Sequence, residues 1–146
     1  MRTYKLYLIE DEFASHYFGR EKMFFELFQE KYHFEGELKT IIEKQIDYIT
    51  KPIPSLQIHK LIHQRLGKNK DFSIKRGIYY IEKMGSVNFA QLQVFERFIL
   101  VQAKGSYDSE TIFFEVLRKC ETSFLAIDFN NQRFGWLKPI KERKFV

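Results

Sequence analysis

The stretch Phe124-Leu-Ala-Ile-Asp-Phe-Asn-Asn-Gln-Arg-Phe-Gly-Trp-Leu137 carries the clearest local signal in this chain of 146 residues. Two apolar runs, 124–129 and 133–137, flank Asn130-Asn131, and asparagine is one of the few residues that tolerate a positive φ. A tight two-residue hairpin turn needs that conformation at its central positions. The stretch therefore predicts an antiparallel β-hairpin with its turn at Asn130-Asn131.

Upstream of this hairpin the pattern continues as strands, with one helix between. Strands are predicted over residues 74–81, 87–95 and 98–103, and a helix over 109–120 joins the last of them to the hairpin. The three strands follow one another through short turns. This half of the chain therefore predicts an antiparallel sheet.

The first half of the chain is mostly helical after one strand. In a strand over 3–9, Tyr4, Leu6 and Leu8 share one face, and Tyr7 and Ile9 share the other. Apolar residues then recur at helical spacing over 12–18, 20–32, 37–50 and 55–66. The predicted order is βαααα-βββ-α-ββ in a single domain, residues 1–146. This order is typical of an α+β fold whose mostly antiparallel sheet has helices packed on one face.

Composition narrows the class of protein. The chain is 45% hydrophobic and 29% charged, with 3 Pro and 7 Gly, which excludes disordered and fibrous proteins. A single cysteine, Cys120, no apolar run long enough to span a bilayer and no signal peptide favour a cytoplasmic protein. The net charge of +5 permits an anionic partner without demanding one. The aromatic share, 17%, exceeds what one core of this size needs, so we expect some aromatic side chains to face outward.

No set of residues predicts catalysis or cofactor binding. His59 and His63 have the spacing of zinc ligands on a helix, but no third ligand is evident and ordinary helix packing explains them. Cys120 follows a helix whose dipole disfavours a thiolate, and Asp128 is an isolated acid on a strand. The glycines form no phosphate-binding loop. We expect no enzyme, no metal and no cofactor, and a small enzyme built on Asp128 or the histidine pair is the least supported alternative.

A second alternative is a module that binds single-stranded nucleic acid on its sheet. Such modules stack bases on exposed aromatic side chains within a basic groove. The predicted central strands supply aromatic and basic residues of this kind, although the RNA-recognition motif is missing: Tyr79, Tyr80, Phe89, Phe95, Phe98, Lys75, Arg76 and Lys83.

An aromatic pair near the amino terminus suggests a protein-binding surface. Phe13 and Tyr17 lie four residues apart and emerge on one side of the first predicted helix. Phe18 points about 100° away and can enter the core, which would leave the pair outside as interface anchors. Periodicity alone also allows both rings to be core residues.

Blocks at both ends of the chain resemble the SirA family of Bacillus and its relatives, the sporulation inhibitors of replication. The amino-terminal blocks are Glu12-Phe-Ala-Ser-His-Tyr-Phe-Gly-Arg-Glu21, Phe25-Glu-Leu-Phe-Gln29, Glu43-Lys-Gln-Ile46, Tyr48-Ile-Thr50 and Pro52-Ile-Pro54. The carboxyl-terminal blocks are Glu110-Thr-Ile-Phe-Phe-Glu-Val-Leu-Arg-Lys119, Phe124-Leu-Ala126, Asp128-Phe-Asn130, Gly135-Trp-Leu137, Lys141-Glu-Arg143 and Phe145-Val146.

The resemblance implies a non-enzymatic inhibitor of replication initiation that binds the amino-terminal domain of the initiator DnaA, with no membrane partner and no direct contact with nucleic acid. It also implies the binding residues. The family's aromatic pair falls on Phe13 and Tyr17, with Ala14 between them, its polar contact falls on Gln45, and a proline falls on Pro139. Tyr48, about one turn beyond Gln45 on the same predicted helix, is added on spacing alone.

Overall fold

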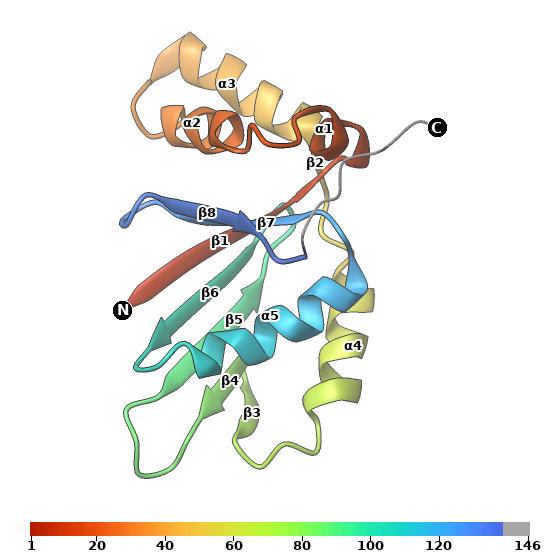
Figure 1. The fold of residues 1–146 in the computed structure, drawn as a ribbon, viewed down its shortest axis with the longest axis vertical. Coiled ribbons are helices and arrows are strands. Elements are labelled where there is room, and N and C mark those ends of the chain that lie inside the picture. The colour runs from red at the N-terminus through yellow and green to blue at the C-terminus, as the bar shows by residue number, and fades with distance from the viewer. Residues whose placement is uncertain (139–146) are drawn as a thin grey trace.

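An eight-stranded antiparallel sheet runs through residues 1–138, the part of the chain that the computed structural model describes (Figure 1). Seven strands lie in the order β3-β4-β5-β6-β1-β7-β8, and the eighth, β2, pairs with the end of β1. Their bounds are β1 Arg2–Ile9, β2 Thr50–Lys51, β3 Phe72–Lys75, β4 Ile78–Glu82, β5 Phe89–Val94, β6 Ile99–Lys104, β7 Phe124–Asp128 and β8 Arg133–Trp136.

The five helices of the described residues confirm the predicted α+β class and the general order of elements. They are α1 Asp11–His16, α2 Lys22–Glu30, α3 Gly36–Ile49, α4 Ser55–Leu66 and α5 Asp108–Cys120. Their ends differ from the predicted ends by no more than two residues. The apolar periodicity therefore located every one of these helices.

The helices occupy both faces of the sheet, whereas packing on one face was predicted. On β1, Leu6 and Leu8 belong to a first core cluster beneath α4 and α5, while Tyr7 and Ile9 belong to a second core cluster beneath α1, α2 and α3. Figure 1 shows the two helix groups at opposite ends of the molecule. The alternation along β1 was predicted correctly, and it places apolar side chains on both faces, so both faces must be covered.

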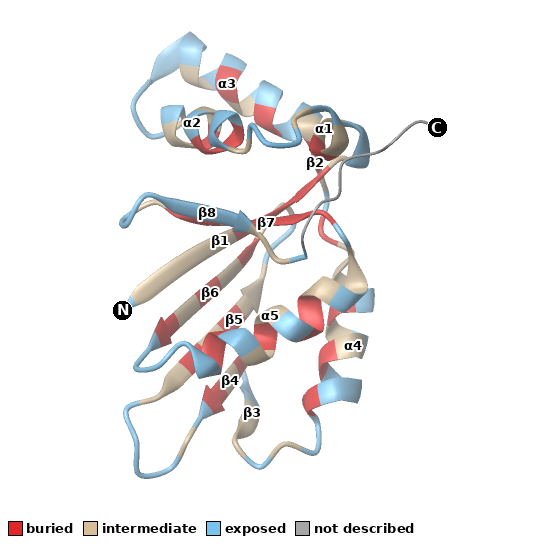
Figure 2. Cartoon of the chain, viewed as in Figure 1, coloured by how far each residue is buried: buried red, intermediate tan, exposed pale blue. Residues whose placement is uncertain are grey.

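Strands and helices both contribute residues to each cluster. Figure 2 shows these buried residues in red on the strands and on the helices. The first core cluster consists of Leu6, Leu8, Ile53, Ile58, Ile62, Leu66, Tyr79, Ile81, Ala90, Leu92, Ile99, Val101, Ala103, Phe113, Val116, Leu117 and Phe124. The second consists of Tyr7, Ile9, Ala14, Phe24, Phe25, Phe28, Ile42, Ile46, Leu125 and Ile127.

The single strand predicted over 74–81 is wrong, because this segment forms the β3–β4 hairpin. The chain reverses at Arg76-Gly77, where φ is +53° and +78°. Lys75 pairs with Ile78, so the connection has the two residues with positive φ that a tight hairpin turn requires. The two-residue strand β2 was also missed, since two residues are too few to show an alternation.

The hairpin predicted at the carboxyl end exists, but its turn differs from the prediction. Asp128 pairs with Arg133, which leaves a four-residue connection, 129–132, and the positive φ falls on Gln132 rather than on either asparagine. The reason is the Asp128 carboxylate, which accepts hydrogen bonds from the backbone N–H of Asn131 at 3.2 Å and from its side-chain amide at 2.8 Å. These bonds close the wider loop in place of a two-residue turn.

Candidate functional site

The helix α1 is short and is held firmly at its start. Asp11 accepts a hydrogen bond from the Ser123 hydroxyl at 2.8 Å, and the backbone N–H of Glu10 donates to the carbonyl of Ile49 at 2.8 Å. Ala14, 2% exposed, is the residue through which α1 enters the second core cluster. These contacts fix α1 between β1 and the carboxyl end of α3.

With Ala14 inward, the predicted aromatic pair lies at the border between core and solvent. Phe13 and Tyr17 are half-buried and pack at the edge of the second core cluster. Phe18, expected to enter the core, is instead 40% exposed, because α1 ends at His16 and Phe18 lies in the turn that follows. Each ring therefore has one side on the core and one side towards solvent.

The two rings connect α1 to the neighbouring helices. The Phe13 ring meets the Tyr48 ring of α3 edge to face at 5.5 Å between centroids. The Tyr17 ring meets the Phe24 ring of α2 in the same way at 5.6 Å, and the Arg20 guanidinium lies 5.6 Å from the Tyr17 centroid. Residues from three helices are thereby brought into one surface.

This surface contains two adjoining hollows, which we call together the helical surface. The first, of about 220 Å³, is lined by Phe13, Tyr17, Met23, Phe24, Leu27 and Ile49. The second, of about 450 Å³, is lined by Leu27, Ile41, Lys44, Gln45, Tyr48 and Ile49. Leu27 and Ile49 line both, so the two hollows adjoin, and most of their lining is apolar.

Several apolar side chains of the helical surface are open to solvent. Tyr48 is 74% exposed, Ile41 52% and Met23 49%. On α3, only Ile42 and Ile46 of the predicted apolar stripe are buried. Contiguous exposed apolar groups of this kind mark interaction sites more often than chance exposure does.

The structure therefore brings together the predicted Phe13, Tyr17, Gln45 and Tyr48, with Ala14 buried beneath them. Pro139 lies outside the described residues. Sequence reasoning did not include Met23, Leu27 and Ile41 in the surface. Their helical spacing is that of residues in a buried apolar stripe, so the sequence suggested that they lie in the core. Which of them stay exposed depends on how closely α2 and α3 pack.

A hydrogen bond from the sheet supports the residues beneath the helical surface. The Trp136 indole donates to the Glu21 carboxylate at 3.1 Å, and its ring lies 6.0 Å from the Phe24 ring. Burial would raise the pKa of Glu21, but the hydrogen bonds from Trp136 and from the backbone N–H of Gly19 outweigh it and lower that pKa. The carboxylate is held charged at the start of α2, where the helix dipole favours it.

The histidine pair and Cys120 have identifiable neighbours in the fold. His59 shares a hydrogen bond with the Tyr79 hydroxyl, and the His63 ring packs edge to face on the Tyr79 ring at 5.7 Å. Burial and the neighbouring Glu121 carboxylate raise the pKa of the Cys120 thiol.

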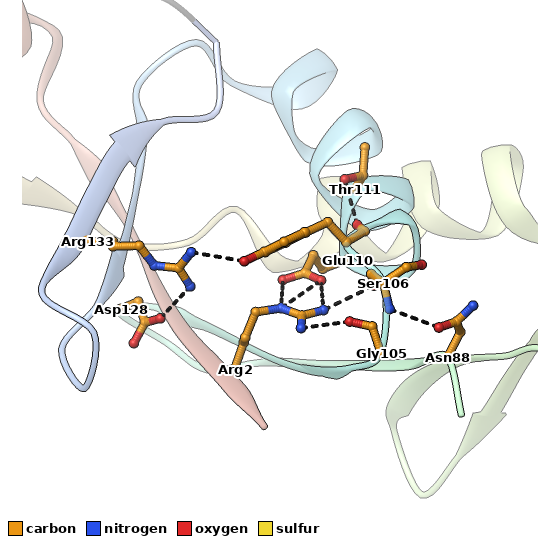
Figure 3. Close-up of polar contacts among 9 residues, drawn as sticks. Arg2, Asn88, Gly105, Ser106, Glu110, Thr111, Asp128 and Arg133 are labelled. Atoms are coloured by element: carbon orange, nitrogen blue, oxygen red, sulfur yellow. Dashed lines mark hydrogen bonds and ion pairs between the residues drawn. The ribbon is translucent and has the colours of Figure 1, made fainter. Parts of the chain in front are cut away.

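Asp128 belongs to a polar network between the sheet and α5 (Figure 3). It accepts a hydrogen bond from Arg133 at 2.9 Å, alongside the loop bonds described above. Nearby, the buried Glu110 is paired with Arg2, which also donates to the carbonyls of Gly105 and Ser106. Each of these two carboxylates is thus matched by a guanidinium, as buried charge requires.

Within residues 1–138, none of the helices combines the length and the apolar character that crossing a bilayer requires.

Comparison with known proteins gives two results. The family model of the sporulation inhibitor of replication protein SirA matches residues 2–141. A relative from Bacillus subtilis (strain 168), named sporulation inhibitor of replication protein SirA, is 49% identical over 148 residues, and the match covers 99% of each chain.

Proposed function

Because the chain belongs to the SirA family of sporulation inhibitors of replication, we propose that it inhibits replication initiation by binding the amino-terminal domain of DnaA through the helical surface. The observation that carries this proposal is the convergence of Phe13, Tyr17, Gln45 and Tyr48 on two adjoining hollows whose lining is mainly apolar. The sequence alone points to the same four positions, Tyr48 by helical spacing and the others by the family resemblance.

The chemistry of the surface suits a protein partner. Aromatic rings that are already packed on one side lose little conformational entropy on binding, and such rings are common among interface hot spots. The two hollows would accept apolar side chains of the partner, and the exposed Gln45 amide would fix their orientation. A specific complex needs to bury only about 800 Å² on each partner.

The residues have different parts in this proposal. Phe13, Tyr17 and Tyr48 contact the partner, while Ala14, because it is buried, seats α1 without touching the partner. Pro139, carried over from the resemblance, follows the described residues and is proposed as a further contact. The inhibitor acts by occupying a surface that DnaA needs during initiation, and no catalytic step is required.

Isothermal titration of the protein against the isolated amino-terminal domain of its own organism's DnaA tests the proposal. Tyr48→Ala is the cleanest variant because Tyr48 is 74% exposed, so its removal leaves the core unchanged. We expect it to weaken binding about tenfold, and Phe13→Ala or Tyr17→Ala to cost at least about 2 kcal/mol of binding free energy.

A control is Leu56→Ala, which removes another large exposed side chain, 87% exposed, on the distant helix α4. It should bind as the wild type does. Circular dichroism of each variant separates loss of binding from loss of fold. The proposal fails if the wild type does not bind, or if folded Phe13→Ala and Tyr48→Ala variants bind normally.

A further inference from the structure

The strands β3 to β6 have one face that the described residues leave open. Their inward side chains, such as Ile81, Leu92 and Val101, belong to the first core cluster beneath α4 and α5. The second core cluster, on the opposite face, draws on β1 and β7 and contains no buried residue from β3 to β6. In Figure 1 the helices α1, α2 and α3 accordingly lie beyond β1 and β8, at the far end from β3.

The register aligns the side chains of this open face in rows. One row crosses five strands, and each neighbouring pair in it is a direct cross-strand pair: Ser73, Tyr80, Gln91, Gln102 and Thr3. A second row contains Glu82, Phe89 and Lys104. Since neighbouring strands lie about 4.8 Å apart, the first row is roughly 19 Å long.

Two aromatic rings lie side by side on the open face. The Tyr80 and Phe89 centroids are 6.1 Å apart, and the Lys75 ammonium lies 5.8 Å from the Tyr80 centroid. Neither ring is buried. Tyr79, the adjacent residue, points to the other face and is 2% exposed, so only one of the two consecutive tyrosines is available.

Apart from Ile78 and Leu100, the rest of the open face is polar, and it carries a small positive excess. Gln91 donates from its side-chain amide to the Gln102 carbonyl at 2.7 Å, and both amides keep further donor and acceptor capacity. The available cations are Lys75 and Lys104, whereas the Lys5 ammonium is already bonded to the Tyr32 hydroxyl and lies over the Tyr32 ring. The strand residues of this face include one acid, Glu82. The whole chain has a net charge of +5, of the same sign.

We infer that this open face binds single-stranded nucleic acid. Aromatic rings with a free face stack on unpaired bases of any sequence, and lysines neutralise the phosphates. A row of amides can form hydrogen bonds with the edges of the bases. A second copy of the chain is less well matched, because two such faces would place their positively charged lysines against each other, where they repel. The inference departs from the expectation of no direct contact with nucleic acid, and it is independent of the proposed binding to DnaA.

Fluorescence anisotropy with a fluorescein-labelled single-stranded oligothymidylate of about 15 nucleotides tests the inference at about 50 mM salt. We expect saturable binding that weakens roughly tenfold when the salt is raised to about 200 mM. Tyr80→Ala should weaken binding at least about fivefold because it removes a stacking ring, and Tyr80→Phe should restore it. Lys75→Glu combined with Lys104→Glu should cost at least about tenfold.

The control is Tyr48→Ala, which removes an exposed tyrosine from the helical surface and should leave this affinity unchanged. Failure of the wild type to saturate at low salt would overturn the inference, as would equal losses in Tyr80→Ala and Tyr48→Ala. Sedimentation that shows a dimer dissociated by Tyr80→Ala, without oligonucleotide binding, would assign the face to a second copy instead.

Discussion

Asp128 illustrates how a buried carboxylate stabilises the fold of this protein. It is 1% exposed, and its partners are the Arg133 guanidinium and two N–H groups of Asn131. Burial would raise the pKa of Asp128, but these hydrogen bonds and the guanidinium outweigh it, so the pKa is lower than usual. A carboxyl group with a lowered pKa stabilises the folded state wherever it is ionised.

Asp128→Asn should therefore lower the free energy of unfolding by about 2 kcal/mol at pH 7. An unfolded aspartate has a pKa of about 3.9, so the contribution of Asp128 is complete above about pH 5 and disappears as the pH falls through its lower folded pKa. Urea denaturation followed by circular dichroism, at pH 7 and near pH 3, measures the difference between variant and wild type. The difference should shrink in acid, and an unchanged difference would show that the ionised form is unimportant.

The connections between elements depend on glycines in the left-handed region, and two of them allow a matched comparison. Gly77 in the β3–β4 turn has φ +78°, and a Cβ there would meet nothing within 4 Å. Gly105 between β6 and α5 has φ +82°, and its Cβ would meet Asn88 Oδ1, whose present partner is the N–H of Ser106 at 2.9 Å. The backbone strain is equal at the two sites, and only Gly105 adds a steric conflict.

Gly77→Ala should cost about 1 kcal/mol of unfolding free energy, from the positive φ alone. Gly105→Ala should cost at least about 2 kcal/mol, because Asn88 must also move and lose its hydrogen bond. Thermal or urea denaturation of both variants measures the difference. In an Asn88→Ala background the cost of Gly105→Ala should fall toward that of Gly77→Ala, and an undiminished cost would exclude the Asn88 conflict as its cause.

The same elements show what the sequence could predict. Long amphipathic segments such as α3 and α5 were located correctly because their periodicity extends over several turns. The reversal at Arg76-Gly77 was missed because apolar residues continue on both sides of it, and the loop after Asp128 was misjudged because a side chain, not the turn residues, determines its width. In the helical surface, spacing pointed to Phe13, Tyr17 and Tyr48, whereas Gln45 came only from the family resemblance. The contribution of Leu27 depends on how α2 packs against α3.

At the scale of the whole molecule, the two core clusters share their strands. Neighbouring residues of β1 and of β7 point alternately into the first and the second cluster, as Phe124 and Leu125 do. If the helices over one cluster left the sheet, they would expose apolar residues of β1 and β7. The same two strands also carry residues of the other cluster, so its packing would be weakened as well. We therefore expect residues 1–146 to unfold as one cooperative domain rather than as two.

Ile62→Ala tests this expectation, because Ile62 is completely buried in the first cluster, on α4. The cavity should cost about 2 to 5 kcal/mol of unfolding free energy. Trp136 packs on Phe24 in the second cluster and provides a fluorescent probe on the opposite face of the sheet. If the molecule is one cooperative unit, the urea midpoint reported by Trp136 must fall by the same amount as the midpoint from far-ultraviolet circular dichroism. A Trp136 midpoint that stays at the wild-type value while the dichroism midpoint falls would mean that the two helix groups unfold independently.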